Sequence, residues 1–141
     1  MHVLIVDDEP HIRTILARIL HGAGHTTCWA SDGHGALRLL FGEAIDLILL
    51  DMHLPDMSGW DVARAKYSDP KLRPIPIIVL SGMDLEEVRA ISRVNVLENA
   101  TILNKPFYAK DVLQAIEDAV PIQNRRDTKP DFTDDEEPTK P

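Results

Sequence analysis

The sequence has little cysteine and no long apolar runs. Cys28 is the only cysteine among 141 residues, so the chain holds neither an internal disulfide nor a cluster of thiolate metal ligands. No apolar run approaches the roughly 20 residues that span a bilayer. The first residues also lack the basic start and the longer apolar region of a secretory signal. These absences predict a cytoplasmic protein that is not inserted in a membrane.

Positive charge is scarce as well. Lys and Arg together number 15 against 23 Asp and Glu, which gives a formal net charge of −8. An acidic domain repels nucleic-acid phosphates and anionic lipid surfaces, and no basic stripe offsets this repulsion. Direct binding to nucleic acid or to a membrane surface is therefore disfavoured. The apolar fraction of 44% is sufficient for the core of one domain.

Five short apolar runs alternate with segments of helical periodicity over residues 1–120. The apolar runs are Val3–Val6, Thr26–Ala30, Leu47–Leu50, Ile75–Leu80 and Ala100–Leu103. The helical segments contain the stripes Ile12–Leu20, Ala36–Leu40, Trp60–Tyr67 with Ser58 as its N-cap, Leu85–Ile91 and Val112–Val120. Nearly continuous apolar strands that alternate with helices predict a parallel sheet covered on both faces. We predict an α/β fold, a doubly wound five-stranded parallel sheet of order 2-1-3-4-5 with five helices.

The composition changes after residue 120. Residues 121–141 contain several prolines and the acidic run Asp134–Glu137, and Ile122 and Phe132 are their only large apolar side chains. Such a segment cannot bury enough apolar surface to offset the entropy lost on ordering. We therefore predict one domain over residues 1–120, followed by an acidic, proline-containing disordered tail or linker.

Polar residues follow the apolar runs at the edge where an open α/β sheet places its site. Asp7 and Asp8 follow the first run, Asp51 the third, Ser81 the fourth and Lys105 the fifth. The first and third strands are neighbours in the predicted order, so three carboxylates converge. Each pair at 4 Å repels by about 4 kcal/mol at an effective dielectric constant of about 20. Lys105 and a hard divalent cation such as Mg²⁺ would offset this repulsion, and a carboxylate so placed can accept a phosphoryl group.

These motifs resemble a known family. The segments VLIVDDEP, LILLDMHLPDMSGWD, PIIVLSG and LNKPF together resemble the receiver domain of two-component response regulators, in order and spacing, over residues 1–120. The resemblance implies a phosphorelay protein in which Asp51 accepts the phosphoryl group from a sensor histidine kinase or a histidine phosphotransfer protein. It implies a switch that is no enzyme on an external substrate, although it catalyses its own phosphorylation and dephosphorylation.

The resemblance also implies a role for each polar residue. The implied protein ligands of Mg²⁺ are Asp8, Asp51, Asp7 through water, and the backbone carbonyl of His53. Lys105 would pair with the phosphoryl group, and Ser81 would move toward it and shift the face formed by helix 4, strand 5 and helix 5. The peptide bond before Pro106 is expected to be cis. One residue departs from the family pattern: the usually aromatic switch position on strand 5 is Ile102, which leaves the form of the output change open.

Other functions remain as alternatives at this point. A phosphorylation-independent interaction module of the same fold is the main one, although Asp51, Asp8 and Lys105 are all present. A Mg²⁺-dependent phosphatase for small phosphate esters is disfavoured, because His53 stands where a second acidic residue is usual. The output partner is an effector protein or domain, and the protein is a single-domain regulator, a relay intermediate or the receiver portion of a longer regulator. The sequence leaves open whether phosphorylation drives formation of a homodimer.

The remaining ligand-type side chains show no site in the sequence. The six histidines have no spacing typical of a zinc site, and apart from His53 we expect them on the surface. His53 stands beside the expected acceptor and is expected to affect the phosphoryl lifetime. Cys28 is predicted to be a buried apolar residue in the second strand.

Overall fold

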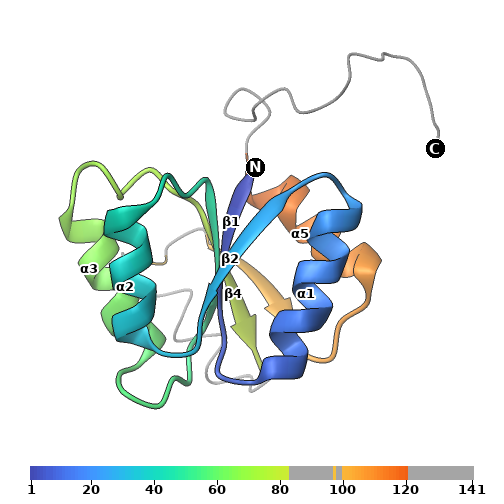
Figure 1. The fold of residues 1–141 in the computed structure, drawn as a ribbon, viewed down its shortest axis with the longest axis horizontal. Coiled ribbons are helices and arrows are strands. Elements are labelled where there is room, and N and C mark those ends of the chain that lie inside the picture. Colours follow the sequence, from blue (N-terminus) through green and yellow to red (C-terminus); the bar gives the residue numbers. More distant parts are fainter. Residues whose placement is uncertain (83–96, 98–99, 121–141) are drawn as a thin grey trace.

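The computed structural model describes residues 1–82, 97 and 100–120 and shows one sheet between two pairs of helices (Figure 1). The strands are β1 (His2–Val6), β2 (Thr26–Ala30), β3 (Leu47–Asp51), β4 (Ile77–Ser81) and β5 (Thr101–Asn104). The helices are α1 (Pro10–Gly22), α2 (Gly33–Gly42), α3 (Gly59–Ser68) and α5 (Ala109–Ala119). The strand order is β2-β1-β3-β4-β5 and every neighbouring pair is parallel, which confirms the predicted topology. The helix predicted over Leu85–Ile91 and the tail predicted over residues 121–141 lie outside the described residues.

The two faces of the sheet form two cores, because side chains alternate between the faces along each strand. Leu4, Ile48 and Val79 point toward α2 and α3. Ile5, Leu49 and Ile78 point toward α1 and α5. Figure 1 shows the corresponding layers, with α2 and α3 on one side of the sheet and α1 and α5 on the other. The central strands β1, β3 and β4 are buried on both faces, which explains their nearly continuous apolar sequences.

The boundaries of β1, β3, β4 and β5 differ from the sequence prediction by one or two residues. β4 begins at Ile77 instead of Ile75, and Pro76 immediately before it has no N–H to give to a neighbouring strand. The carbonyl of Pro76 still accepts a hydrogen bond from the backbone N–H of Ile48 at 3.1 Å. β5 extends to Asn104, which lies opposite Ser81 in the sheet. β3, β4 and β5 each extend one residue past the predicted apolar run, so they end on the polar residues Asp51, Ser81 and Asn104.

The start of α3 follows the prediction. Ser58 is the N-cap, its hydroxyl accepts a hydrogen bond from the N–H of Asp61, and the Asp61 carboxylate accepts one from the N–H of Ser58 at 3.1 Å. These reciprocal bonds form a capping box. A second carboxylate in the same loop, Asp56, accepts the backbone N–H groups of Gly33 and His34 at the start of α2, and these bonds lower its pKa. The loop after β3 is therefore held to α2 through Asp56 and to α3 through Ser58.

None of the helices in the described part of the chain has the length and apolar composition required to cross a lipid bilayer.

Lys66 on α3 is buried, although lysine is usually a surface residue. Its Nζ donates a hydrogen bond to the carbonyl of Arg73 at 2.7 Å. Burial, with a smaller contribution from the charge of Arg73, lowers the pKa of Lys66 from 10.5 to about 8. At neutral pH the folded protein therefore holds a poorly hydrated charge, which opposes folding.

We expect Lys66→Met to raise the free energy of unfolding at pH 7 by about 2 kcal/mol. The lowered pKa corresponds to a cost of about 3 kcal/mol, and the lost hydrogen bond returns about 1 kcal/mol. Between pH 8 and 10.5 Lys66 loses its proton in the folded wild type before it does so in the unfolded chain, so the free energy of unfolding of the wild type rises with pH. The difference in free energy of unfolding between the variant and the wild type therefore shrinks over this range. Urea unfolding at pH 7 and pH 10 measures both effects. The exposed Lys71→Met is the matched control, and a deficit that is the same at both pH values contradicts the prediction.

Candidate functional site

Three carboxylates meet at the carboxyl edge of the sheet. Asp7 and Asp8 follow β1, and Asp51 is the last residue of the neighbouring strand β3. Each carboxylate offers one oxygen, and these three oxygens all lie within 4.8 Å of one another. Asp7 and Asp51 are buried, whereas Asp8 is exposed. The structure thus brings together the three acidic residues that the sequence places at this edge, with one of them open to solvent.

Lys105 supplies the positive charge nearest to these carboxylates in the described part of the chain. Its Nζ donates a hydrogen bond to Oδ2 of Asp7 at 2.9 Å and lies 3.6 Å from Oδ2 of Asp51. Glu9 is a more distant partner, with its Oε1 3.9 Å from Nζ. Burial lowers the pKa of Lys105, but the hydrogen bond to Asp7 and the charges of Asp51, Asp7 and Glu9 outweigh burial and raise the pKa overall. Lys105 is therefore fully charged at neutral pH.

Asp51 is oriented from two sides. Its Oδ1 accepts the backbone N–H of His53 at 3.1 Å, and its Oδ2 faces Lys105. Burial raises the pKa of Asp51; the His53 hydrogen bond and the Lys105 charge oppose this rise, and the charge of Asp7 adds to it. The carboxylate is thus held in place but poorly solvated, which favours the arrival of a further positive charge.

Ser81 and Lys105 complete the polar edge from the next two strands. Ser81, at the end of β4, is buried, and its carbonyl accepts the backbone N–H of Lys105 at 2.7 Å. The peptide bond between Lys105 and Pro106 is cis, as the family resemblance implies. Ile102 packs against the core on the α2 and α3 face of the sheet, so an aliphatic side chain occupies the usual switch position.

Gly59 allows α3 to begin directly beside the end of β3. A Cβ at this position would lie 2.8 Å from the carbonyl oxygen of Asp51 and 2.8 Å from the Cα of Met52. The N–H of Gly59 also donates a hydrogen bond to the carbonyl of Met52 at 3.0 Å. The close approach of two backbones therefore requires glycine and fixes the position of Asp51.

The donor set fits a magnesium ion. Mg²⁺ prefers oxygen ligands and is usually held by one or two carboxylates, with water on its remaining positions. Asp8 is exposed to an incoming hydrated ion, whereas both oxygens of Asp7 already accept hydrogen bonds, from Lys105 and from the N–H of Glu9. Asp51 contributes a third carboxylate, and its Oδ2 lies 3.6 Å from Nζ of Lys105. The cluster therefore has the charge and the ligand type that this cation requires.

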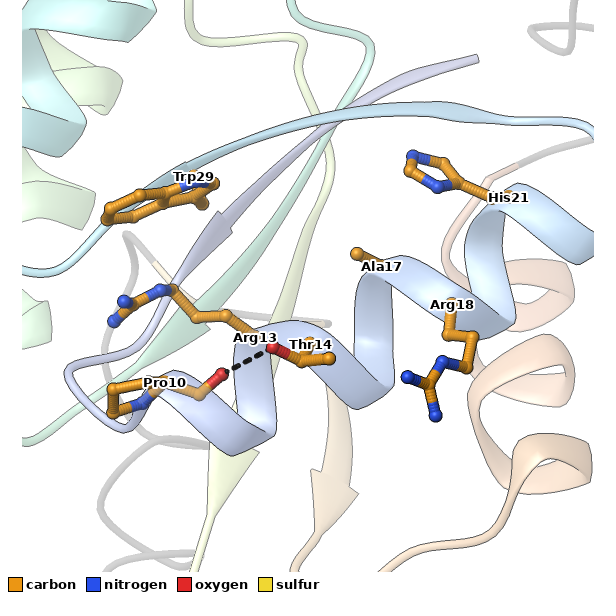
Figure 2. A pocket seen from close by; sticks show the side chains of 7 residues that line it. All are labelled: Pro10, Arg13, Thr14, Ala17, Arg18, His21 and Trp29. Atoms are coloured by element: carbon orange, nitrogen blue, oxygen red, sulfur yellow. Dashed lines mark hydrogen bonds between the residues drawn. The ribbon is translucent and has the colours of Figure 1, made fainter.

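A separate groove lies between α1 and β2 (Figure 2). Its lining residues are Pro10, Arg13, Thr14, Ala17, Arg18, His21 and Trp29. The guanidinium of Arg13 lies over the ring of Trp29, 4.1 Å from its centroid, and Nη1 of Arg13 donates a hydrogen bond to the carbonyl of Asp7 at 2.9 Å. The groove has no carboxylate in its lining, but Arg13 connects it to the acidic cluster.

Comparison with known proteins identifies the class to which this fold and this acidic edge belong. Residues 3–117 match the family described as response regulator receiver domain. The chain belongs to this family of two-component signalling proteins.

Several individual relatives are similar over nearly their whole length. Sporulation initiation phosphotransferase F of Bacillus subtilis is 31% identical over 123 residues, which cover 86% of this chain and 95% of the relative. Chemotaxis protein CheY of Pseudomonas aeruginosa is 31% identical over 118 residues, which cover 83% of this chain and 94% of the relative. Among solved structures, chemotaxis protein CheY4 of Vibrio cholerae superposes with a TM-score of 0.76 at 26% identity, covering 84% of this chain and 98% of that one.

Proposed function

We propose that this receiver domain is a phosphorylation switch in which Asp51 accepts a phosphoryl group from a phosphohistidine. The donor is a sensor histidine kinase or a histidine phosphotransfer protein. An oxygen of Asp51 forms a bond to phosphorus, the phosphorus–nitrogen bond of the donor breaks, and the released imidazole nitrogen takes up a proton. The observation that carries this proposal is the convergence of three carboxylates and one lysine at the end of β3.

The other residues of the cluster hold a cation and neutralise charge. Asp8 and Asp51 would hold Mg²⁺ directly, Asp7 would hold it through water, and the backbone carbonyl of His53 would supply a further oxygen. When bound, Mg²⁺ neutralises the negative charge that builds up on the phosphoryl oxygens during transfer. Lys105 remains charged and close to Oδ2 of Asp51, where it pairs with a phosphoryl oxygen.

The output is a change in protein contacts. Ser81 approaches the phosphoryl group and, through its backbone contact with Lys105, couples the site to β5 and α5. An effector protein or domain binds the altered face, and the domain itself contacts no nucleic acid and turns over no external substrate. The folding unit is residues 1–120, residues 121–141 are a tail or linker, and the protein works in the cytoplasm. Size-exclusion chromatography of the phosphorylated protein tests whether phosphorylation drives formation of a homodimer.

Intact mass spectrometry tests the proposal. We expect the protein incubated with a small acyl phosphate and Mg²⁺ to gain one phosphoryl group, and we expect EDTA to abolish the gain. Reduction with borohydride, which converts an aspartyl phosphate to homoserine, followed by peptide mapping, places the modification on Asp51. If neither small donors nor a set of phosphohistidine proteins modifies folded protein, the proposal is wrong and a phosphorylation-independent interaction module replaces it.

A further inference from the structure

A second cluster of metal-ligand side chains lies at the opposite, amino edge of the sheet. His2 begins β1, Cys28 is in the middle of β2, and Glu43 follows the last turn of α2. One atom from each side chain, an imidazole nitrogen, the Sγ of Cys28 and a carboxylate oxygen, lies within 4.8 Å of the other two. From these three side chains we infer a binding site for a borderline-soft divalent cation, Zn²⁺ in the first instance, that is distinct from the magnesium site.

Strand register explains why three positions far apart in sequence meet. His2 lies opposite Thr26 in the parallel pair of β1 and β2, and Cys28 follows Thr26 by two residues. The side chains of His2, Thr26 and Cys28 therefore point to the same face of the sheet, because side chains alternate along a strand. The end of α2 covers this corner and places Glu43 above it, with Oε1 of Glu43 2.9 Å from Nε2 of His2.

The imidazole of His2 is fixed before any cation arrives. Its Nδ1 lies 2.7 Å from the hydroxyl of Thr26, which leaves Nε2 as the nitrogen that faces Glu43. The backbone of His2 is held at both of its polar groups by Asp46: its N–H donates to Oδ2 at 2.7 Å, and its carbonyl accepts the N–H of Asp46 at 2.8 Å. Metal-binding histidines are typically oriented by such a partner on the second ring nitrogen.

The carboxylate of Glu43 lies close to both other side chains of the cluster. Nε2 of His2 lies 2.9 Å from Oε1 of Glu43, and the Sγ of Cys28 lies within 4.8 Å of a ligand atom of each of these two side chains. A divalent cation would displace the thiol proton to solvent and would be held by one nitrogen, one sulfur and one oxygen, the ligand types that Zn²⁺ takes.

The geometry requires only small movements. Metal–ligand bonds of about 2.0–2.3 Å place the ligand atoms of a tetrahedral site roughly 3.3–3.7 Å apart. The three ligand atoms already lie within 4.8 Å of one another, and Nε2 of His2 and Oε1 of Glu43, now 2.9 Å apart, would move slightly away from each other. The side chains of His2 and Glu43 are 27% and 42% exposed, so a cation has a route from solvent and water can take the fourth position. The hard oxygen cluster at the carboxyl edge favours Mg²⁺, so the two edges select different ions.

Titration with Co²⁺, a spectroscopic substitute for Zn²⁺, tests this site in the presence of saturating Mg²⁺. We expect one equivalent of Co²⁺ to produce a thiolate-to-cobalt charge-transfer band, and Zn²⁺ to remove the band by displacement. Cys28→Ser abolishes the band, and His2→Gln and Glu43→Gln weaken Co²⁺ binding about a hundredfold or more. Thr26→Val weakens it about tenfold, as for other partners of metal-bound histidines. The exposed His11→Gln is the matched control and leaves binding unchanged.

The outcomes separate the inference from a hydrogen-bond network and from a misfolded variant. Urea unfolding of each variant shows whether it retains the fold. Absence of the band in folded wild-type protein overturns the inference and leaves the three side chains as a network joining β1, β2 and α2. A band that persists at full affinity without His2 and Glu43 also overturns it, because Cys28 alone then binds the probe. Protection of the Cys28 thiol from a thiol reagent by Zn²⁺ is the independent supporting result.

Discussion

Asp51→Asn is expected to abolish incorporation of a phosphoryl group from both small acyl phosphates and phosphohistidine donors. The asparagine side chain keeps the shape of Asp51 but is far too weak a nucleophile toward phosphorus. The same variant is expected to have a higher free energy of unfolding than wild type in EDTA, because burial raises the pKa of Asp51 and its charge opposes folding at neutral pH. Intact mass spectrometry and urea unfolding measure the two effects.

The opposite signs of these two effects make the Asp51 prediction specific. A variant that merely damaged the fold would lose both phosphorylation and stability. Asp118→Asn is the matched control, because Asp118 is an exposed carboxylate on α5 and the chemical change is the same. Continued Mg²⁺-dependent phosphorylation of Asp51→Asn would show that the acceptor is another residue.

Lys105→Met is expected to lower the free energy of unfolding in EDTA by about 2 kcal/mol. Asp7 is fully buried and would lose a partner 2.9 Å away, while three carboxylates would remain close together. Removal of one partner from a fully buried ion pair costs about 3–5 kcal/mol, and solvent around the partly exposed Lys105 reduces this cost. We also expect phosphoryl incorporation to slow about a hundredfold, as for other groups that stabilise developing charge.

Saturating Mg²⁺ is expected to recover most of the stability lost in Lys105→Met, since the cation brings positive charge to the same carboxylates. Urea unfolding with EDTA and with Mg²⁺ measures this recovery. Lys110→Met, which removes an exposed lysine at the start of α5, serves as the matched control. Equal stability of the two variants in EDTA would contradict the role assigned to the Lys105 contact with Asp7.

The sheet could be predicted from the sequence because its central strands are buried on both faces. Every residue of the strand Leu47–Asp51 is buried. A strand covered on both faces consists of consecutive apolar residues, and here it ends at a polar residue. β2 gave a weaker signal because it is one of the two edge strands, and Trp29 on it is 57% exposed. The positions of Asp7, Asp51 and Lys105 at one edge followed from the strand order alone.

Contacts set by side-chain rotamers and register could not be predicted in this way. The sequence placed Lys105 near the phosphoryl group, but not its hydrogen bond to Asp7 at 2.9 Å against 3.6 Å to Asp51. The burial of Lys66 has no sequence signal, since its hydrogen-bond partner, the carbonyl of Arg73, lies in a loop beyond the end of α3. Cys28 proved only partly buried, and His2 is not a plain surface residue, because both side chains turn toward the end of α2.

Arg13 contacts both Asp7 and Trp29 and so connects the acidic site to a fluorescent side chain. A shift of the Asp7 carbonyl displaces the guanidinium that it binds, and the same guanidinium lies over the indole ring of Trp29. A cation over the ring face changes the electric field at the indole. We therefore expect the fluorescence emission of Trp29 to change when a cation binds beside Asp7, and with only two tryptophans in the chain, Trp60→Phe leaves Trp29 as the single indole emitter.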